Sequence, residues 1–570
     1  MKLAPILIVP LAAAALASST PTPAKACGGF FCSSVPVDQT GEQILFGMNG
    51  GKITATIAID YQGEAEQFSW LLPVASKPEI TLGSQAAFTN LGYATQPRWN
   101  LQWNTDGQQC NYWWFYPVAE DSDTSAGNGG GRDVNVLATK EVGPFETVVL
   151  ESSSTDDLLA WLDDNGYDQP PETRGLIAHY VAQDMVFVAL RLQKNEPTGA
   201  IQPITLTFDE AAPCVPLVLT QVAAQPDMPV QIFLASDHRV VPTNWMHVTL
   251  NEKKINWLDY GSNYKTVVTD AIDEASGHGF VTEYAGTSAF AHELVYREGQ
   301  FDLAALAATT HPEDFVMKLL QQGFPRDSQM QGLLRKHIPM PASLVAEGVT
   351  EQQFYNDLGS YTEALAAAGF VFDPAAFVAD LEERVVEPLR ATQAMLDGRP
   401  YFTRLYTTVS PDEMTRDPIF AENADLPDVS NVHTATATPT CGEANQMPES
   451  IEIALASGET FTLQGPFEQT YPIVYPDPAP DEPNALKIEL IGATGAGSVV
   501  HPSQVRAVDF ALDTQTPDAV LTDLANGSFP ITHTPGGGGA AVSGGCSQGG
   551  TLGGLAAAIS AIALLFRRRR

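Results

Sequence analysis

Aromatic side chains crowd one short stretch of the sequence, where they could bind a ligand. Half of the eight tryptophans lie between positions 99 and 114, and a tyrosine follows them at 116. The candidate contact residues are Trp99, Trp103, Trp113, Trp114 and Tyr116. Trp99 and Trp103 would share one face of a strand, because side chains alternate along it. Exposed rings would offer a platform for a glycan or an envelope protein, whereas buried rings would form an ordinary β core.

An acidic segment at 120–133 suggests weak calcium binding, with Asp121 and Asp123 as candidate ligands. The spacing departs from that of an EF-hand loop, which would need glycine at Ala126 and glutamate at Arg132. A flexible acidic loop is the alternative interpretation. Calcium is therefore the only cofactor we consider, and no metal site is assigned.

The sequence does not identify a set of catalytic residues. The stretch 278–298 contains two histidines and three glutamates, and His292-Glu293 begins the HExxH pattern of zinc proteases. Tyr296 stands where the second histidine would be. We therefore expect binding or a structural role rather than catalysis, and the catalytic residues of any enzyme activity stay unknown.

Six cysteines predict disulfides if the chain is exported, because thiols pair in oxidising compartments. They are Cys27, Cys32, Cys110, Cys214, Cys441 and Cys546. If Cys546 serves in anchoring, the other five are disulfide candidates, and an odd number leaves one without an internal partner. Spacing alone does not fix the connectivity.

Both ends of the chain predict export and attachment to a membrane. Residues 1–26 have the basic start, apolar run and small-residue end of a secretory signal peptide. Residues 549–566 carry no charge and are long enough to span a bilayer. The arginines at 567–570 would hold that end in the cytoplasm. The bulk of the protein is then extracytoplasmic, in the cell envelope or on the outer surface.

The C-terminal segment resembles the sorting signals of myxobacteria, in which a cysteine in a Gly-rich stretch precedes an apolar helix. Here Cys546 lies in the Gly-rich spacer 533–548. The resemblance implies processing by a sorting protease and surface anchoring at or near Cys546. A retained transmembrane helix is the alternative.

The charge balance excludes one class of partner. Lys and Arg number 30 against 67 Asp and Glu, which gives a net charge of −37. Binding to a phosphate backbone needs clustered cations. We therefore expect no nucleic-acid partner.

The element pattern predicts a β-rich α+β fold of antiparallel sheets, with a helical insert and a small C-terminal β domain. Short alternating or apolar runs indicate strands, among them 215–222. Residues 154–167 read as a helix, and a long helix is expected to bend near Pro388. The predicted order is signal peptide 1–26, β-rich domain or domains 27–300, helical region 301–400, end of the family region 401–430, linker 431–447, small β domain 448–532, Gly-rich spacer 533–548, transmembrane helix or sorting signal 549–566 and basic tail 567–570.

Several phrases occur in one order along the chain and carry a family resemblance. They are ACGGFFC at 26–32, FSWLLPV at 68–74, LLAWLDDNGY at 158–167, FVALRL at 187–192, the run 216–245, and RLYTTVSPDEMTRDPIF at 404–420. Together they resemble the bacterial domain of unknown function 2330 family. The resemblance implies an exported, often surface-anchored protein. It implies no activity and no site residues.

These observations favour an exported, surface-anchored envelope protein that acts by binding or as a structural component. The expected partners are the membrane, a sorting protease, and a glycan or an envelope protein. The alternatives are an exported hydrolase acting on envelope polymers and an assembly scaffold for a surface structure. A hydrolase would need a cleft with two close carboxylates, one of raised pKa.

Overall fold

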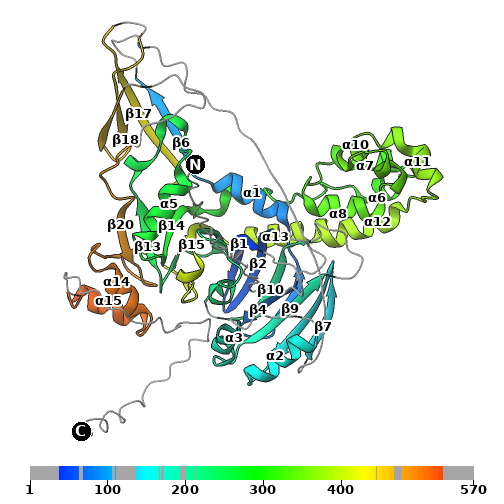
Figure 1. Ribbon diagram of the computed structural model, residues 1–570, viewed down its shortest axis with the longest axis horizontal. Helices are drawn as coiled ribbons and strands as arrows, with labels where there is room; N and C mark the ends of the chain where they lie inside the picture. The colour runs from blue at the N-terminus through cyan, green and yellow to red at the C-terminus, as the bar shows by residue number, and fades with distance from the viewer. Residues whose placement is uncertain are drawn as a thin grey trace, which may run out of the picture.

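A ten-stranded sheet forms the centre of the molecule in the computed structural model (Figure 1). The structure describes residues 38–62, 69–104, 110, 136–165, 167, 173–192, 201–210, 212–443, 446–465, 467 and 478–529. In spatial order the strands are β21 (Ser498–Val499), β20 (Ala485–Leu490), β13 (Met246–Leu250), β14 (Gly279–Thr287), β15 (Tyr401–Val409), β11 (Met228–Ser236), β1 (Asp38–Asn49), β2 (Lys52–Gln62), β10 (Ile204–Asp209) and β5 (Glu79–Leu82). Neighbours are antiparallel except for the parallel pairs β1–β11 and β13–β14.

A second sheet packs on one face of the first. Its order is β4 (Ser69–Val74), β9 (Val186–Leu192), β8 (Phe145–Glu151) and β7 (Val136–Val142). A large apolar core fills the space between the two sheets, with Phe46 and Ile232 on one side and Val188 on the other. The outer face is covered by α2 (Thr155–Asp164) and α3 (Thr173–Val181) through a separate apolar cluster.

The predicted helix at 154–167 corresponds to α2. Ser154 caps it by accepting a hydrogen bond from Asp157 N at 3.2 Å, as an N-cap serine should. Asp156 and Asp157 occupy the first turn, where negative charge favours the helix dipole.

The helical insert lies between β14 and β15, which pair with each other in the sheet. In Figure 1 its helices form a lobe beside the sheet. They are α6 (Leu303–Ala307), α7 (Pro312–Gln321), α8 (Ser328–His337), α9 (Ala342–Ala346), α10 (Glu351–Asn356), α11 (Thr362–Ala367), α12 (Pro374–Leu381) and α13 (Glu387–Asp397). A π-helical turn at Glu382–Val386 joins α12 to α13, directly before Pro388, because proline cannot donate the hydrogen bond of a regular turn.

A third sheet joins distant parts of the chain. Its order is β19 (Thr460–Gln464), β18 (Ser450–Leu455), β17 (Val432–Thr440) and β6 (Arg98–Trp103), and β6 pairs with β17 in parallel. Its apolar residues belong to a core cluster that extends through α5 (Tyr264–Asp273) and the adjoining part of the central sheet to α14 (Val505–Leu512) and α15 (Pro517–Ala525). The short pair β12 (Val240–Pro242) and β16 (Phe420–Glu422) completes the sheets described, and α1 (Gln85–Thr95) precedes β6.

The α+β class with a helical insert is confirmed, but two expected boundaries change. Residues 432–440, expected within the linker 431–447, form β17. The segment 448–532 is not a separate domain, because β18 and β19 extend the third sheet and β20 and β21 extend the central one. The alternating threonines and alanines of β17 pair with β6, a partner more than 300 positions away that no local pattern reveals.

The predicted strand 215–222 is also corrected. Its centre, Leu217–Thr220, is the short helix α4. A short apolar run fits either element, and here long-range contacts decide between them. Asp417 accepts a hydrogen bond from Val218 N at 2.9 Å and fixes this turn.

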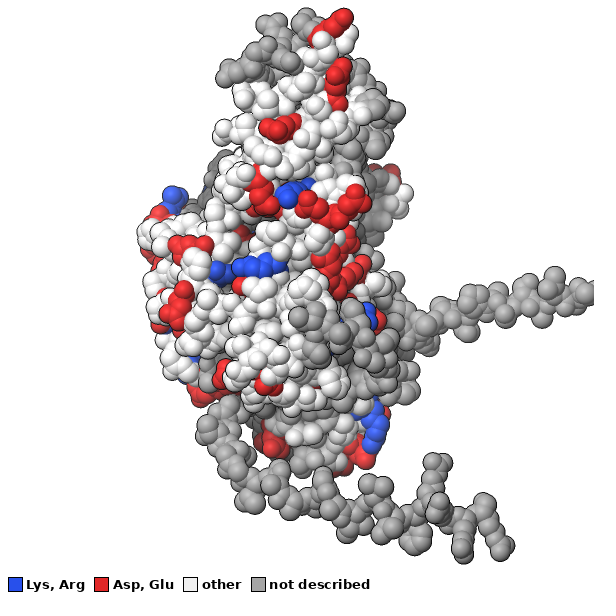
Figure 2. Space-filling view, turned by 90° about the vertical axis from the view of Figure 1, so that its left-hand side faces the viewer, with Lys and Arg blue, Asp and Glu red and all other residues white. Residues whose placement is uncertain are grey.

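The surface carries the acidic excess. Figure 2 shows acidic side chains predominating on the face that includes β18, β20 and α14. None of the helices in the described part of the chain is long and apolar enough to cross a membrane. The predicted signal peptide 1–26, spacer 533–548, apolar segment 549–566 and basic tail 567–570 lie outside the described residues.

Candidate functional site

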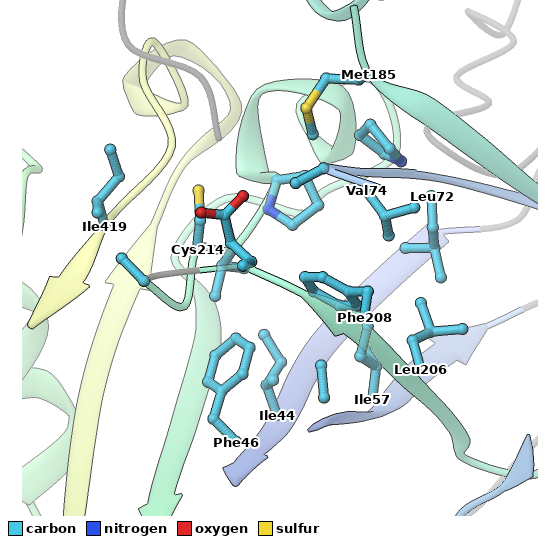
Figure 3. Close-up of a pocket in the computed structure, with 17 residues that line it drawn as sticks. Ile44, Phe46, Ile57, Leu72, Val74, Met185, Leu206, Phe208, Cys214 and Ile419 are labelled. Carbon is cyan, nitrogen blue, oxygen red and sulfur yellow. The ribbon is translucent and has the colours of Figure 1, made fainter. Parts of the chain in front are cut away.

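Several cavities adjoin the central sheet in the described part of the chain, and the first of three large ones is apolar (Figure 3). It measures about 220 Å³ and lies between the central sheet and the β4–β9 sheet. Phe46, Ile57 and Phe208 line one side, and Leu72 and Val74 line the other. Glu210 is the single carboxylate among the described residues of its lining. This cavity continues the core between the sheets and lacks converging polar groups.

The second cavity, here called the sheet cleft, has a polar floor. It measures about 450 Å³ and lies on the opposite face of the central sheet. Gln43 and Gln231 face each other across β1 and β11, with Gln43 Nε2 donating to Gln231 Oε1 at 3.1 Å. Tyr406 on β15 continues the row beside Gln231. On the same sheet face, apolar residues adjoin this row along the strands at Leu45 and Phe233, and across them at Val281 beside Tyr406.

A buried ion pair closes the end of the sheet cleft. Arg404 Nε donates to Glu283 Oε2, and both side chains are less than a tenth exposed. Arg404 Nη1 also donates to Gly92 O at 2.9 Å and to Thr95 Oγ1 at 3.2 Å. Tyr264 donates its hydroxyl to Glu283 Oε1 at 2.7 Å. Both oxygens of Glu283 therefore have partners.

A bulge in β14 positions Glu283. Thr282 pairs with Leu405, but Tyr284 pairs with Arg404, so Glu283 is the extra residue between them. A bulge turns a side chain out of the regular alternation and is frequent beside functional sites. Here it turns Glu283 toward Arg404.

The mouth of the sheet cleft holds Asp60 and Tyr260. Asp60 is solvent-exposed, although partial desolvation by the surrounding protein raises the pKa of its carboxyl. Tyr260 is 47% exposed and adopts a positive φ of 50°, which is costly for a residue with a side chain and frequent at functional sites. On the floor, burial raises the pKa of Tyr406 to about 12, so it is a neutral hydroxyl at ordinary pH.

Glu42 also borders this cleft, but its carboxyl group lies on the opposite face of the central sheet. It alternates with Gln43 along β1. Its side chain accepts a hydrogen bond from Gln39 Nε2 at 3.2 Å. Asp60 and the paired Glu283 are therefore the carboxylates of the cleft among the described residues.

Trp99 forms the wall between the sheet cleft and the third cavity. Its indole stacks on His433 at 4.1 Å between ring centroids and meets Trp257 edge-on at 5.1 Å. Gly261, with φ +79°, lies so close to this indole that a Cβ there would overlap it. Glycine is required at this point for both reasons.

The third cavity, here called the strand-gap cavity, opens where β13 and β14 separate. These parallel strands, linked through α5, pair only at Met246–Gly279 and His247–Phe280. Beyond that point a space of about 430 Å³ lies between them. It shares Pro97, Trp99, Tyr264 and Glu283 with the sheet cleft. Ligands of parallel sheets commonly bind beyond the carboxyl ends of the strands.

Arg239 and His247 line the strand-gap cavity, and both are 6% exposed. Arg239 Nη1 donates to Pro427 O at 2.8 Å, and Nη2 donates to Thr282 Oγ1 at 3.2 Å. Thr282 Oγ1 lies 2.6 Å from His247 Nε2. Burial, together with the charges of Arg239 and Lys487, lowers the pKa of His247 to about 3. The imidazole is therefore neutral.

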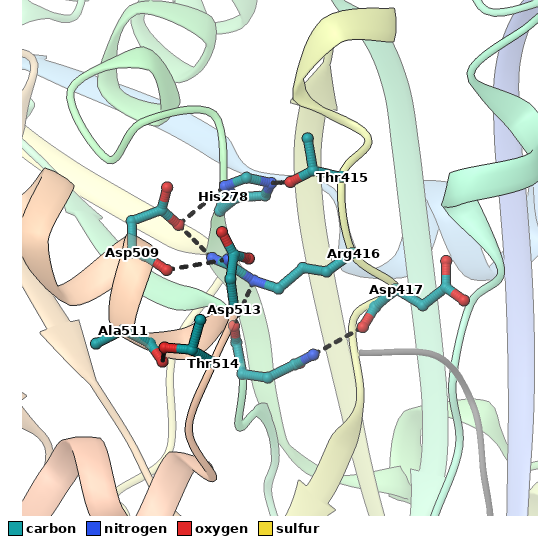
Figure 4. A network of polar contacts seen from close by, with 9 residues as sticks. His278, Thr415, Arg416, Asp417, Asp509, Ala511, Asp513 and Thr514 are labelled. Carbon is teal, nitrogen blue, oxygen red and sulfur yellow. Dashed lines mark hydrogen bonds and ion pairs between the residues drawn. The ribbon is translucent and has the colours of Figure 1, made fainter. Parts of the chain in front are cut away.

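A separate polar network is structural (Figure 4). Arg416 is 1% exposed and forms ion pairs with Asp509 and Asp513 of α14. His278 Nδ1 lies 2.9 Å from Asp509 Oδ1 and Nε2 lies 3.1 Å from Thr415 Oγ1. These groups bond to one another and attach α14 to the core.

The structure places some of the predicted site residues and not others. Trp99 is buried and Trp103 half-buried, in the core of the third sheet. Cys110 and Cys441 form a disulfide with a Cα–Cα distance of 5.8 Å, and Cys214 is also disulfide-bonded. The remaining candidates lie outside the described residues: Trp113, Trp114, Tyr116, Asp121, Asp123, Cys27, Cys32 and Cys546.

The histidines and glutamates of 278–298 do not converge on one site. His278 bonds to Asp509, Glu283 pairs with Arg404, and His292 lies beside Asp397 at 3.4 Å. Within the described ranges, no group of three or more His, Cys, Asp or Glu side chains could hold a metal ion.

The polar floor of the sheet cleft was missed at the sequence level. Gln231 and Arg404 stand in strands that otherwise read as buried, and a charged residue inside an apolar strand was the available signal. Asp60 and Tyr260 carry no local pattern that separates them from ordinary surface residues.

Comparison with known proteins gives a family but no function. The family model described as "Uncharacterized protein conserved in bacteria (DUF2330)" matches residues 21–333. The phrase at 404–420, which supplies Arg404 and Tyr406, lies beyond that match. Searches among curated proteins and among solved structures found no match. With more than half of its length matched, the chain belongs to the bacterial DUF2330 family.

Proposed function

We propose that this protein is an exported, surface-anchored envelope protein that binds a neutral, hydroxyl-rich ligand such as a glycan in the sheet cleft. The observation that carries the proposal is the paired glutamines in the floor of that cleft, on a sheet face that is apolar beside them at Leu45 and Phe233. A face that served only packing would be apolar throughout. Binding sites are concave and hold a few fixed polar groups.

The side chains of the cleft match the chemistry of a sugar. The amides of Gln43 and Gln231 can both donate and accept hydrogen bonds, as sugar hydroxyls do. The neutral hydroxyl of Tyr406 adds another such group. The exposed ring of Tyr260 offers an apolar face at the mouth.

The carboxylates of the cleft favour binding over glycoside hydrolysis. A hydrolase of the usual type needs two available carboxyl groups. Glu283 is fully engaged by Arg404 and Tyr264, which leaves Asp60 alone. Turnover of a bound glycan would support the hydrolase alternative instead.

The binding test measures thermal unfolding of the protein with a panel of neutral envelope glycans and oligosaccharides. A ligand at 100 times its Kd should stabilise the folded state by about 2.7 kcal/mol. Tyr260→Ala should weaken binding about tenfold, which corresponds to roughly 1.4 kcal/mol. Gln231→Leu should weaken it as well.

Tyr93→Ala is the matched control, because Tyr93 is 66% exposed and lies outside the lining of the three cavities. It should bind as the wild type does. No saturable shift with any neutral glycan, or an equal loss in the Tyr93 variant, would refute the glycan site.

The proposal of export and anchoring rests on the predicted signal peptide and the predicted C-terminal anchor. The Cys110–Cys441 disulfide supports an oxidising compartment. We expect surface labelling of intact cells to reach the protein. A Cys546→Ala variant should lose its normal surface attachment if a sorting protease acts there. Recovery of the protein in the cytoplasm with its first 26 residues would contradict export.

A further inference from the structure

Arg239 is a buried cation without a carboxylate partner. Among the described residues, no Asp or Glu oxygen lies within 4.0 Å of it. Buried charges in proteins are normally paired, because an unpaired charge loses its hydration without compensation. Glu489 and Asp428 interact with the charge of Arg239 only electrostatically, without direct contact.

The acids around the strand-gap cavity are already engaged. Glu283 pairs with Arg404, and Glu489 lies 2.9 Å from Lys487. Glu252 lies 2.7 Å from His433 Nδ1. Arg239 is thus the charge left uncompensated among the described side chains of this lining.

Two buried N–H donors of the side chains that line this cavity also lack acceptors. The buried Nε of Arg239 has no hydrogen-bond partner, and neither has Nδ1 of His247. Arg239 Nη2 lies 3.4 Å from His247 Nε2 and can only donate, so Nε2 accepts. In the neutral ring the proton then sits on Nδ1, which becomes a donor.

We propose that the strand-gap cavity binds an oxyanion, best a carboxylate, through Arg239 and His247. One positive charge and two unused N–H donors match the single charge and two oxygens of a carboxylate. The cavity of about 430 Å³ also leaves room for the rest of a small organic acid. Both donors are buried, so contact requires a rotation of these side chains, a common change on binding.

The cavity is built to hold such a ligand in a fixed place. Ala496 and Gly497 line it from the loop after β20. Asp425 Oδ2 accepts from Gly495 N at 2.7 Å, and Asn423 Nδ2 donates to Gly492 O at 2.8 Å. The loop that borders the cavity is therefore fixed to the chain after β16. Arg239 and His247 do not line the sheet cleft, so this proposal rests on other residues than the glycan proposal does.

The test compares sodium acetate, phosphate and sulfate with chloride at equal ionic strength, using the full-length protein. Acetate should raise the melting temperature saturably relative to chloride. Phosphate and sulfate also stabilise folded proteins without binding, so only a saturable effect of either that Arg239→Gln abolishes would identify a larger oxyanion at the same donors. Equal melting temperatures in all four salts would overturn the proposal.

Arg239→Gln should abolish the acetate effect, whereas Arg98→Gln should retain it. Arg98 is exposed and lines none of the three cavities, so it controls for loss of one positive charge. An acetate effect that persists in Arg239→Gln would contradict the assignment. Tyr260→Ala is expected to lose the glycan shift but to keep the acetate shift. A failure of the glycan proposal can therefore be told apart from a failure of the oxyanion proposal.

A measurement on the wild type covers the case in which Arg239→Gln does not fold. The nitrogen resonances of His247 should show a protonated Nδ1 before acetate is added. Saturating acetate should shift that resonance as the N–H gains an acceptor. An unchanged His247 signal at saturating acetate would exclude direct contact.

Discussion

At the scale of single residues, two buried carboxyls determine how the fold responds to pH. Glu42 is 5% exposed and Asp417 is fully buried. Burial raises the pKa of each to about 7, and a hydrogen bond from Gln39 to Glu42 opposes this only in part. The charge of Glu42 adds a smaller contribution to the raised pKa of Asp417.

The sign of the effect follows from linkage. Below about pH 4.5 Glu42 is protonated in both the folded and the unfolded state, and its burial costs no ionisation energy. As pH rises toward 7, the unfolded state ionises while the folded state stays protonated. The free energy of unfolding therefore falls over this window.

Glu42→Gln should remove most of this loss of stability. A rise of the Glu42 pKa from 4.5 to about 7 corresponds to about 3 kcal/mol. Urea unfolding at pH 5 and pH 8 should show a smaller difference in the variant, by about 2 kcal/mol. The exposed Glu79→Gln should keep the wild-type difference. Equal pH slopes in Glu42→Gln and wild type would contradict this account.

At the scale of elements, one arginine adds polar contacts to the apolar packing that attaches α14 to the core. Arg416 Nε donates to Asn244 O at 3.0 Å, while its other nitrogens bond to Asp509 and Asp513 (Figure 4). Although burial alone would raise it, hydrogen bonds from His278 and Arg416 hold the pKa of Asp509 below its ordinary value. This contribution is present above about pH 3.8 and is lost as pH falls below it.

Arg416→Met should destabilise the protein by about 3 kcal/mol, because it leaves two carboxylates without their partner. Asp509 and Asp513 retain 17% and 19% exposure, which limits the cost. Arg174→Met breaks an exposed pair with Asp156 and should cost less than about 1 kcal/mol. Similar denaturation midpoints for the two variants would show that the Arg416 network does not fix α14.

Short sequence patterns predicted the helices and turns whose formation depends on residues near them in the sequence. The pattern at 154–167 indicated α2, which Ser154 caps and which has acids in its first turn. A second local signal is the Ser410–Glu413 capping box, in which Ser410 N donates to Glu413 Oε2 at 2.7 Å. Residues 215–222 were misread because Asp417, nearly 200 positions away, settles their conformation. Packing between distant segments is not encoded in a short window.

The candidate sites were less predictable for the same reason. Trp99 was noticed by composition, but its role as a wall depends on His433 and Trp257. Glu283 meets Arg404 through a bulge between strands 120 positions apart. Arg239 is unusual because it is buried without a carboxylate partner, and no sequence pattern reveals the lack of a partner.

At the scale of the whole molecule, the chain folds as interlocked sheets rather than as a string of domains. The parallel pair β6–β17 joins residues near 100 to residues near 435. The disulfide Cys110–Cys441 closes the same connection across a sequence separation of 331. Removing the segment after 431 would therefore expose β6 and open the central sheet at β13.

The disulfide should contribute substantially to stability, because closing a long loop restricts the unfolded chain. Replacing Cys110 and Cys441 together by serine should lower the free energy of unfolding by about 3–5 kcal/mol. Cys214 is also disulfide-bonded and stays oxidised in this variant. Urea denaturation should therefore order the samples as oxidised wild type, oxidised double variant, then fully reduced wild type. If the oxidised double variant matches the oxidised wild type, the β6–β17 pairing is held by packing alone.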